Sequence, residues 1–122
     1  MPDDGAAAHD LGRRGEELAA RFLTEHGLRI IARNVHLPST EFDLVAQDEA
    51  GLAFVEVKTR STARFGYPYE AVQEAKRRRM ARGALEFMES RQIAEVDYRF
   101  AIVSVLFPDP PAPPRVEWIE EA

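Results

Sequence analysis

The sequence predicts an α/β domain in which a central mixed sheet is flanked by helices. Two segments carry an apolar stripe at helical spacing, and short runs rich in Val, Phe and Leu lie between and after them. The chain has 122 residues, of which 45% are hydrophobic and 30% are charged, as is usual for one globular domain. We therefore expect a single domain over residues 11–122, preceded by a flexible segment at residues 1–10.

The first expected helix covers residues 11–26, and Gly27 is placed to end it. Its small and apolar residues fall on one stripe: Leu11, Gly15, Leu18, Ala19 and Phe22. On the same helical wheel Glu16 borders this stripe, whereas Glu17 points away from it. Glu16 is therefore a candidate for a role inside the protein, and an exposed acid in the first turn of the helix is the equally common alternative.

A first strand at residues 29–35 is expected to lead into a β-hairpin. The hairpin strands are residues 41–46 and 52–58, and the polar residues 47–51 form the loop between them. Folding the chain about Glu49 or just beyond places Asp43 opposite Val55 or Glu56.

The register of this hairpin decides whether its polar residues meet. Glu56 and Lys58 share a face because side chains alternate along a strand. A register that pairs Asp43 with Glu56 brings all three side chains together, with Glu41 beside them. A slip of one residue would turn Asp43 to the other face.

Two carboxylates and a lysine at one place suit metal-dependent cleavage of a phosphodiester. A hard cation such as Mg²⁺, or Mn²⁺ in its place, binds carboxylate oxygens and relieves the repulsion between neighbouring acids. The metal polarises the phosphate and lowers the pKa of a bound water, which Lys58 can orient. The alternative is a structural ion pair across the strands. We favour the functional interpretation because acids and lysines are rarely found on a strand this apolar without a role or a partner.

A second, longer helix is expected at residues 69–90, with Gln73 and Lys76 on the same stripe as its apolar residues. Polar groups on an inward face need partners, so these two residues are candidates for contacting the site or a phosphate. Arg78 and Arg82 share the outer face of the helix in the densest basic run of the chain. A solvated surface is the common explanation for such a run, and contact with a phosphate backbone is the sharper one.

The rest of the chain is expected to complete the sheet. Residues 99–107 form an apolar strand, the proline-rich residues 108–114 form a stiff loop, and residues 116–119 return as an edge strand. The net charge is −5, which argues against a general nucleic-acid binder, but the segment 12–82 carries a small positive excess. The chain has no cysteine, no segment long enough to span a membrane and no signal-peptide pattern, so we expect a cytoplasmic protein.

Several motifs together resemble the bacterial YraN-like family from about Gly12 to Val105. They are Gly12-x-x-Gly15-Glu16, Arg33-Asn34, Glu41-Phe42-Asp43-Leu44, Phe54-Val55-Glu56-Val57-Lys58-Thr59-Arg60 and Gly66-x-Pro68. The resemblance implies a PD-(D/E)xK nuclease with a restriction-endonuclease-like fold, similar to archaeal Holliday-junction resolvases. It also implies that Asp43 and Glu56 are metal ligands, that Lys58 activates the water, and that Glu16 completes the site. Thr40 stands where the family usually has glycine, and Ala101 where it usually has aspartate.

The leading hypothesis is thus a Mg²⁺- or Mn²⁺-dependent endonuclease acting on nucleic acid, expected to be DNA, in branched or duplex form. The catalytic candidates are Asp43, Glu56 and Lys58, and Glu16 and Glu41 are further metal-ligand candidates. The candidates for nucleic-acid contact are Arg60, Gln73, Lys76, Arg78 and Arg82. The alternative is a non-catalytic module that binds nucleic acid or protein on a nuclease-like scaffold. A homodimer is compatible with either hypothesis.

Overall fold

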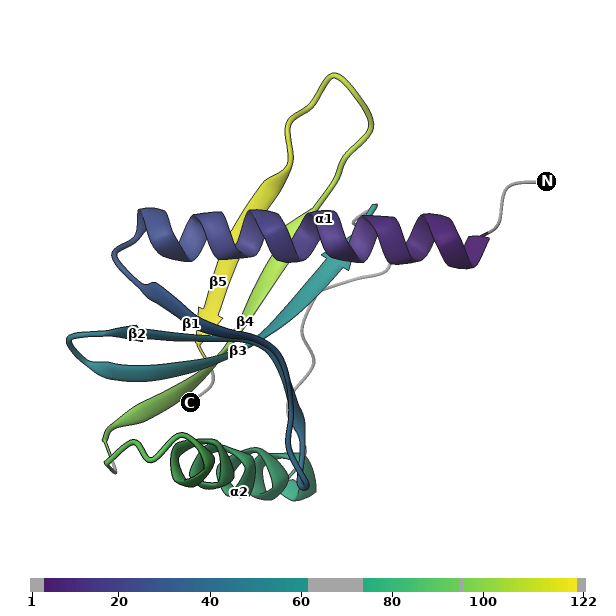
Figure 1. Ribbon diagram of the computed structural model, residues 1–122. Coiled ribbons are helices and arrows are strands. Elements are labelled where there is room, and N and C mark those ends of the chain that lie inside the picture. The colour runs from purple at the N-terminus through teal and green to yellow at the C-terminus, as the bar shows by residue number, and fades with distance from the viewer. Residues whose placement is uncertain (1–3, 62–73, 95, 121–122) are drawn as a thin grey trace.

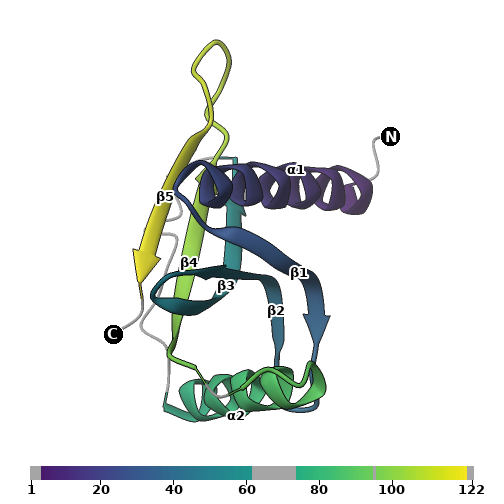
Figure 2. The same cartoon turned by 60° about the vertical axis from the view of Figure 1, so that its left-hand side comes forward.

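The computed structural model describes residues 4–61, 74–94 and 96–120, and it confirms an α/β fold with a mixed sheet between two helices (Figures 1 and 2). The helices are α1 (Asp4–Glu25) and α2 (Glu74–Ser90). The strands, which lie side by side in chain order, are β1 (Arg29–His36), β2 (Glu41–Asp48), β3 (Gly51–Arg60), β4 (Tyr98–Leu106) and β5 (Arg115–Glu120). Neither described helix is long and apolar enough to cross a membrane.

The first three strands form an antiparallel meander, as predicted. β3 and β4 are parallel, and the segment of chain that contains α2 connects them. β5 pairs antiparallel with β4 and is the last strand of the sheet. The sheet is therefore mixed, with β1 and β5 as its edges.

Helix α1 begins earlier than predicted and ends as predicted. It starts at Asp4 rather than Leu11, because the alanines at positions 6–8 have the highest helix propensity of any residue. After Glu25, Gly27 adopts φ 87°, and the Leu28 amide donates to the carbonyl of Leu23 at 3.0 Å. This is the glycine-terminated end expected for the first helix.

The β2–β3 connection is shorter than predicted. Both strands extend further, and Asp48 pairs with Gly51, so only Glu49 and Ala50 remain in the turn instead of five residues. Gly51 adopts φ 126°, and the Ala50 amide donates to Asp48 Oδ1 at 3.0 Å. The side chain of Asp48 thus stabilises a tight turn that the polar composition of the segment had concealed.

Helix α2 covers the other face of the sheet. Its described part begins at Glu74, so the predicted start of this helix and Gln73 lie outside the described residues. Four residues of the predicted stripe, together with Met88, are buried: Met80, Gly83, Ala84 and Phe87. β4 and β5 each begin one residue earlier than predicted, which is the usual uncertainty of a strand boundary.

Two hydrophobic clusters lie on opposite faces of the sheet. The α1-side cluster contains Leu23 and Leu44, with Trp118 of β5 packed against it. The α2-side cluster is centred on Phe54, whose ring lies 4.8 Å from that of Phe42 and 5.7 Å from that of Phe87. Aromatic pairs at these separations contribute beyond the area that they bury. The sheet therefore contributes residues to two hydrophobic cores, one on each of its faces.

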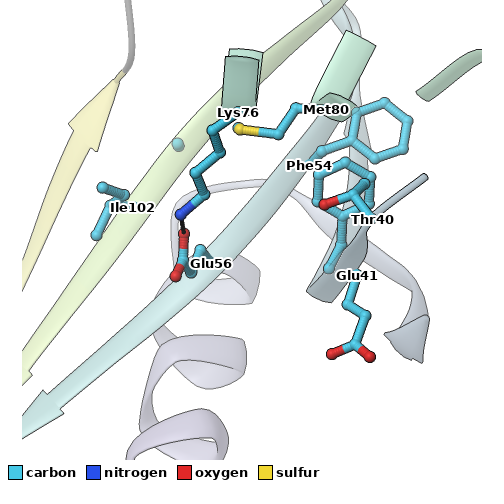
Figure 3. A pocket seen from close by; sticks show the side chains of 9 residues that line it. Thr40, Glu41, Phe54, Glu56, Lys76, Met80 and Ile102 are labelled. Carbon is cyan, nitrogen blue, oxygen red and sulfur yellow. Dashed lines mark hydrogen bonds and ion pairs between the residues drawn. The ribbon is translucent and has the colours of Figure 1, made fainter. Parts of the chain in front are cut away.

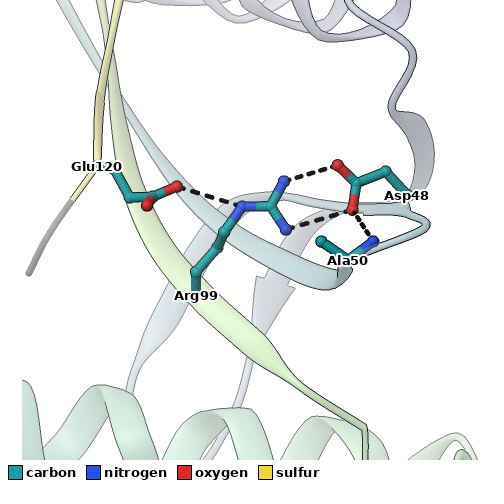
Figure 4. A network of polar contacts seen from close by, with 4 residues as sticks. All are labelled: Asp48, Ala50, Arg99 and Glu120. Carbon is teal, nitrogen blue, oxygen red and sulfur yellow. Dashed lines mark hydrogen bonds and ion pairs between the residues drawn. The ribbon is translucent and has the colours of Figure 1, made fainter.

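Arg99 of β4 ties the hairpin turn to the last strand (Figure 4). Its guanidinium donates to Asp48 Oδ2 at 2.9 Å and approaches Glu120 Oε1 at 3.3 Å. The side chains of Arg99 and Asp48 are only 22% and 25% exposed, so water screens this pair less than an ordinary surface pair. The hydrogen bond from Arg99 holds the pKa of Asp48 below its usual value.

Asp48→Asn is expected to destabilise the protein by about 1–2 kcal/mol at neutral pH. A carboxyl whose pKa is lowered by folding stabilises the native state above its unfolded pKa of about 3.9, and that contribution is lost as the pH falls through the folded value. The difference from wild type should therefore shrink below about pH 4. Urea unfolding at several pH values measures this, with Glu49→Gln in the exposed turn as the control. An equal difference at every pH would contradict the prediction.

Candidate active site

The sheet divides at Asp43. The pairing of β2 with β3 ends at Leu44 and Val55, whereas β1 and β2 stay paired as far as His36 and Glu41. Figure 1 shows the β1–β2 ribbon bending toward α2 while β3 and β4 continue past α1. Continuing the β2–β3 ladder by one residue aligns Asp43 with Glu56, which is the register that the functional interpretation required. We call the place where β2 and β3 separate the fork.

At the fork, where the backbone pairing of β2 and β3 ends, the side chain of Asp43 bonds to the backbone of β3. Its Oδ2 accepts a hydrogen bond from the Val57 amide at 2.7 Å. Burial raises the pKa of Asp43, and the negative charges of Glu56 and Glu41 raise it further, against the opposing effects of Val57 and Lys58. A positive charge near this half-buried carboxylate would therefore stabilise its ionised form.

Glu56 contacts two lysines, Lys58 and Lys76, and Figure 3 shows the contact with Lys76. Its Oε1 is 2.9 Å from Nζ of Lys58, and its Oε2 is 3.2 Å from Nζ of Lys76, which reaches the sheet from α2. Burial raises the pKa of Glu56, but the hydrogen bonds and charges of the two lysines outweigh burial and bring the pKa below its usual value. Glu56 is therefore ionised and bonded through both of its oxygens.

Glu16 approaches the fork from α1. It is half-buried, whereas Glu17 is exposed and lies 3.2 Å from Arg33, as the helical wheel predicted. Burial and the negative charge of Asp43 raise the pKa of Glu16, so the two carboxylates are close enough to repel each other. Glu16 is thus an acid from outside the hairpin that interacts with Asp43.

A close approach of α1 to β3 places Glu16 there. Gly15 is buried, and a Cβ atom at this position would overlap the side chain of Thr59. A helix can approach a strand this closely only where it carries no side chain. Gly15 therefore determines how near its neighbour Glu16 comes to the fork.

The model of a protein family described as Uncharacterised protein family UPF0102 matches residues 15–105. The chain belongs to this family. A UPF0102 protein of Symbiobacterium thermophilum is 50% identical over 95 residues, covering 78% of this chain and 80% of that protein. A UPF0102 protein of Geobacter sulfurreducens is 40% identical over 124 residues, covering 100% and 96% of the two chains.

The matched region of this UPF0102 chain includes the residues that meet at the fork, which are Glu16, Asp43, Glu56 and Lys58. The side chain of Glu41, a further metal-ligand candidate, does not join them. It is exposed, and its Oε1 lies 3.0 Å from Nδ1 of His36. In Figure 3 the carboxylate of Glu41 points away from Glu56. Glu41 contributes to the site through its negative charge on Asp43 rather than by contact.

The candidates for nucleic-acid contact are dispersed in this UPF0102 structure. Lys76 is bonded to Glu56, and Arg60 is half-buried at the end of β3. Arg78 and Arg82 are exposed on α2, and Arg78 lies 3.3 Å from Glu74. Gln73 lies outside the described residues. Lys76 thus contacts a predicted site residue, Glu56.

The carboxylates at the fork are oxygen donors of the kind that hard divalent cations bind. Among the residues that the structure describes, no three His, Cys, Asp or Glu side chains are placed to hold a metal ion together. Burial is the main cause of the raised pKa values of Asp43 and Glu16, and the negative charge of neighbouring carboxylates adds to it, so a cation beside them would favour their ionised forms. Asp43 and Glu16 therefore fit such an ion, and Glu56 fits it once a lysine contact is exchanged.

Two features of the site go beyond what the sequence indicated. Lys76, a candidate for contacting the site, is bonded to Glu56, and the two side chains line a cavity of about 20 Å³ that the sequence did not indicate. The cavity also touches Met80 and Ala101 and has room for one water molecule. Asn34, quoted above only as part of a motif, adopts φ 51° within β1. Asparagine is one of the few residues that tolerate this conformation, which was the available signal.

Proposed function

We propose that this protein is a metal-dependent nuclease of the PD-(D/E)xK superfamily, with a restriction-endonuclease-like fold, that cleaves phosphodiester bonds in duplex or branched DNA. The observation that carries the proposal is the fork, where two strands separate beside Asp43, Glu56 and Lys58 and a helix adds Glu16. The motif resemblance supports the same assignment of roles. A homodimer, which would present two such sites, is part of the proposal for branched substrates.

Each residue at the fork has a distinct task in this proposal. Asp43 and Glu56 would hold Mg²⁺ or Mn²⁺, with Glu16 assisting through water, and the bound ion would polarise the phosphate and acidify a water molecule. Lys58 would leave Glu56 to orient the attacking hydroxide in line with the bond to be broken. The hydroxide oxygen bonds to phosphorus, the opposite P–O bond breaks, and the departing oxygen takes up a proton.

Lys58→Ala is expected to reduce cleavage by at least about a hundredfold, because the variant lacks the group that orients the attacking oxygen. Labelled linear, single-stranded and branched DNA, and RNA, are incubated with the protein and Mg²⁺, Mn²⁺ or EDTA. Wild type should cleave DNA only with metal. Arg79→Ala, an exposed change on α2, serves as the control and should cleave like wild type.

A non-catalytic binding module is the second candidate, and one observation favours it. Both oxygens of Glu56 are bonded to lysines, so this carboxylate is already neutralised without a metal. Such a module would bind nucleic acid or protein equally well in EDTA, and Asp43→Ala and Lys58→Ala would leave that binding intact. Binding of this kind, together with no cleavage by wild type under any metal condition, would refute the nuclease proposal.

A further inference from the structure

Asn34 lies directly across from Asp43. Arg33 pairs with Leu44 and Val35 pairs with Phe42, so the residues between them, Asn34 and Asp43, face each other in the β1–β2 ribbon. Asn34 is also the residue of β1 with positive φ, at 51°. A left-handed conformation inside a strand costs energy in any residue with a side chain, and it persists only where the surrounding structure requires it.

The β1–β2 ribbon changes the face on which its side chains pack at the level of Asn34 and Asp43. Residues two apart on a regular strand share a face, yet Leu44 packs in the α1-side cluster and Phe42 in the α2-side cluster. On β1, Ala32 and Val35 both pack against the α2-side cluster although they are three residues apart. Both strands therefore change faces between Arg33 and Val35 on one side and between Phe42 and Leu44 on the other.

This change of face explains why the fork lies at Asp43. The ribbon leaves β3 after Leu44, and the Asp43 carboxylate turns to the Val57 amide instead of into either core. Asn34 is exposed and lines an open cavity of about 440 Å³ beside Glu16 and Leu44. Removing its side chain would therefore leave no buried void, and the backbone requirement can be tested separately.

We propose that Asn34 is a positioning residue, whose left-handed backbone turns the β1–β2 ribbon and so sets the Asp43 carboxylate at the fork. The catalytic consequence rests on the proposed nuclease function, whereas the placement of Asp43 does not. The role belongs to the backbone conformation rather than to the side-chain amide. A glycine at position 34 should therefore preserve the position of Asp43, whereas an alanine there should not.

Asn34→Gly and Asn34→Ala form a matched pair, since both remove the amide but only glycine accepts positive φ freely. The first measurement is the NMR shift and hydrogen exchange of the Val57 amide without metal. We expect the wild-type result for Asn34→Gly, and a shifted amide that exchanges about tenfold faster for Asn34→Ala. Mn²⁺ affinity by calorimetry and the DNA cleavage rate should fall in Asn34→Ala by a similar factor. Asn34→Ser replaces Asn34→Ala if the alanine variant does not fold.

Equal behaviour of the two variants overturns the proposal. If both resemble wild type, the conformation is not needed, and if both are impaired, the amide is what matters. A wild-type protein that binds no Mn²⁺ and cleaves nothing would end the nuclease proposal instead. The Val57 amide would still decide the role of Asn34, because that measurement needs neither metal nor substrate.

Discussion

Asp43→Asn is expected to lower metal-dependent cleavage by at least about a hundredfold while leaving the fold at least as stable as wild type. The asparagine oxygen can still accept the hydrogen bond of Val57, so the fork keeps its geometry. The negative charge that would attract the metal is lost. Single-turnover cleavage rates and thermal unfolding without metal measure the two effects separately.

The difference in stability between Asp43→Asn and wild type is expected to depend on pH. Burial and Glu56 raise the pKa of Asp43, so its charged form costs stability at neutral pH, and the cost disappears as the pH falls through the raised value. The advantage of Asp43→Asn should be largest at neutral pH and vanish in acid. Asp48→Asn, at the other end of the same strand, should have the opposite sign at neutral pH. A strongly destabilised Asp43→Asn protein would show that the charge has a stabilising partner.

Gly15→Ala is expected to destabilise the protein by about 1–3 kcal/mol and to reduce cleavage. The new methyl group would overlap Thr59, whose branched side chain cannot rotate all of its atoms away. Helix α1 must then move from β3, and Glu16 moves with it. Chemical denaturation measures the loss of stability, and the cleavage rate measures the displacement of Glu16.

Gly12→Ala is the matched control for this change, because a Cβ atom on Gly12 would meet open space. It should stabilise α1 by up to about 1 kcal/mol, since alanine is the better helix former. Thr59→Ala should recover part of the stability lost in Gly15→Ala, as expected for residues in contact. Equal effects of Gly12→Ala and Gly15→Ala would show that the close approach of α1 and β3 is unimportant.

The sequence was sufficient to predict the strands and the helix stripes because burial determines both, but it left two registers of the hairpin open. The structure pairs Leu44 with Val55, both of which lie in the α1-side cluster, and this register aligns Asp43 with Glu56. The inward position of Glu16 followed from its place beside the apolar stripe. These features depend on residues that are near one another in sequence or alternate regularly.

Features that depend on distant partners could not be predicted in the same way. Asp48 at the hairpin turn accepts a hydrogen bond from Arg99, which is 51 residues away in the sequence. The stripe of α2 made Lys76 a candidate for contacting the site, but nothing local to α2 identifies Glu56 as its partner. Asn34 belongs to a residue type that permits positive φ, but only the change of face in the ribbon shows why β1 needs it.

The presence of one core on each side of the sheet determines what an optical melting curve can report. The chain has a single tryptophan, and Trp118 packs against the α1-side cluster. Its fluorescence therefore follows the loss of that side, whereas far-ultraviolet circular dichroism follows both helices and the whole sheet. Coincidence of the two curves would mean that both cores unfold as one cooperative unit. Earlier loss of the dichroism signal would mean that α2 and its aromatic cluster detach first.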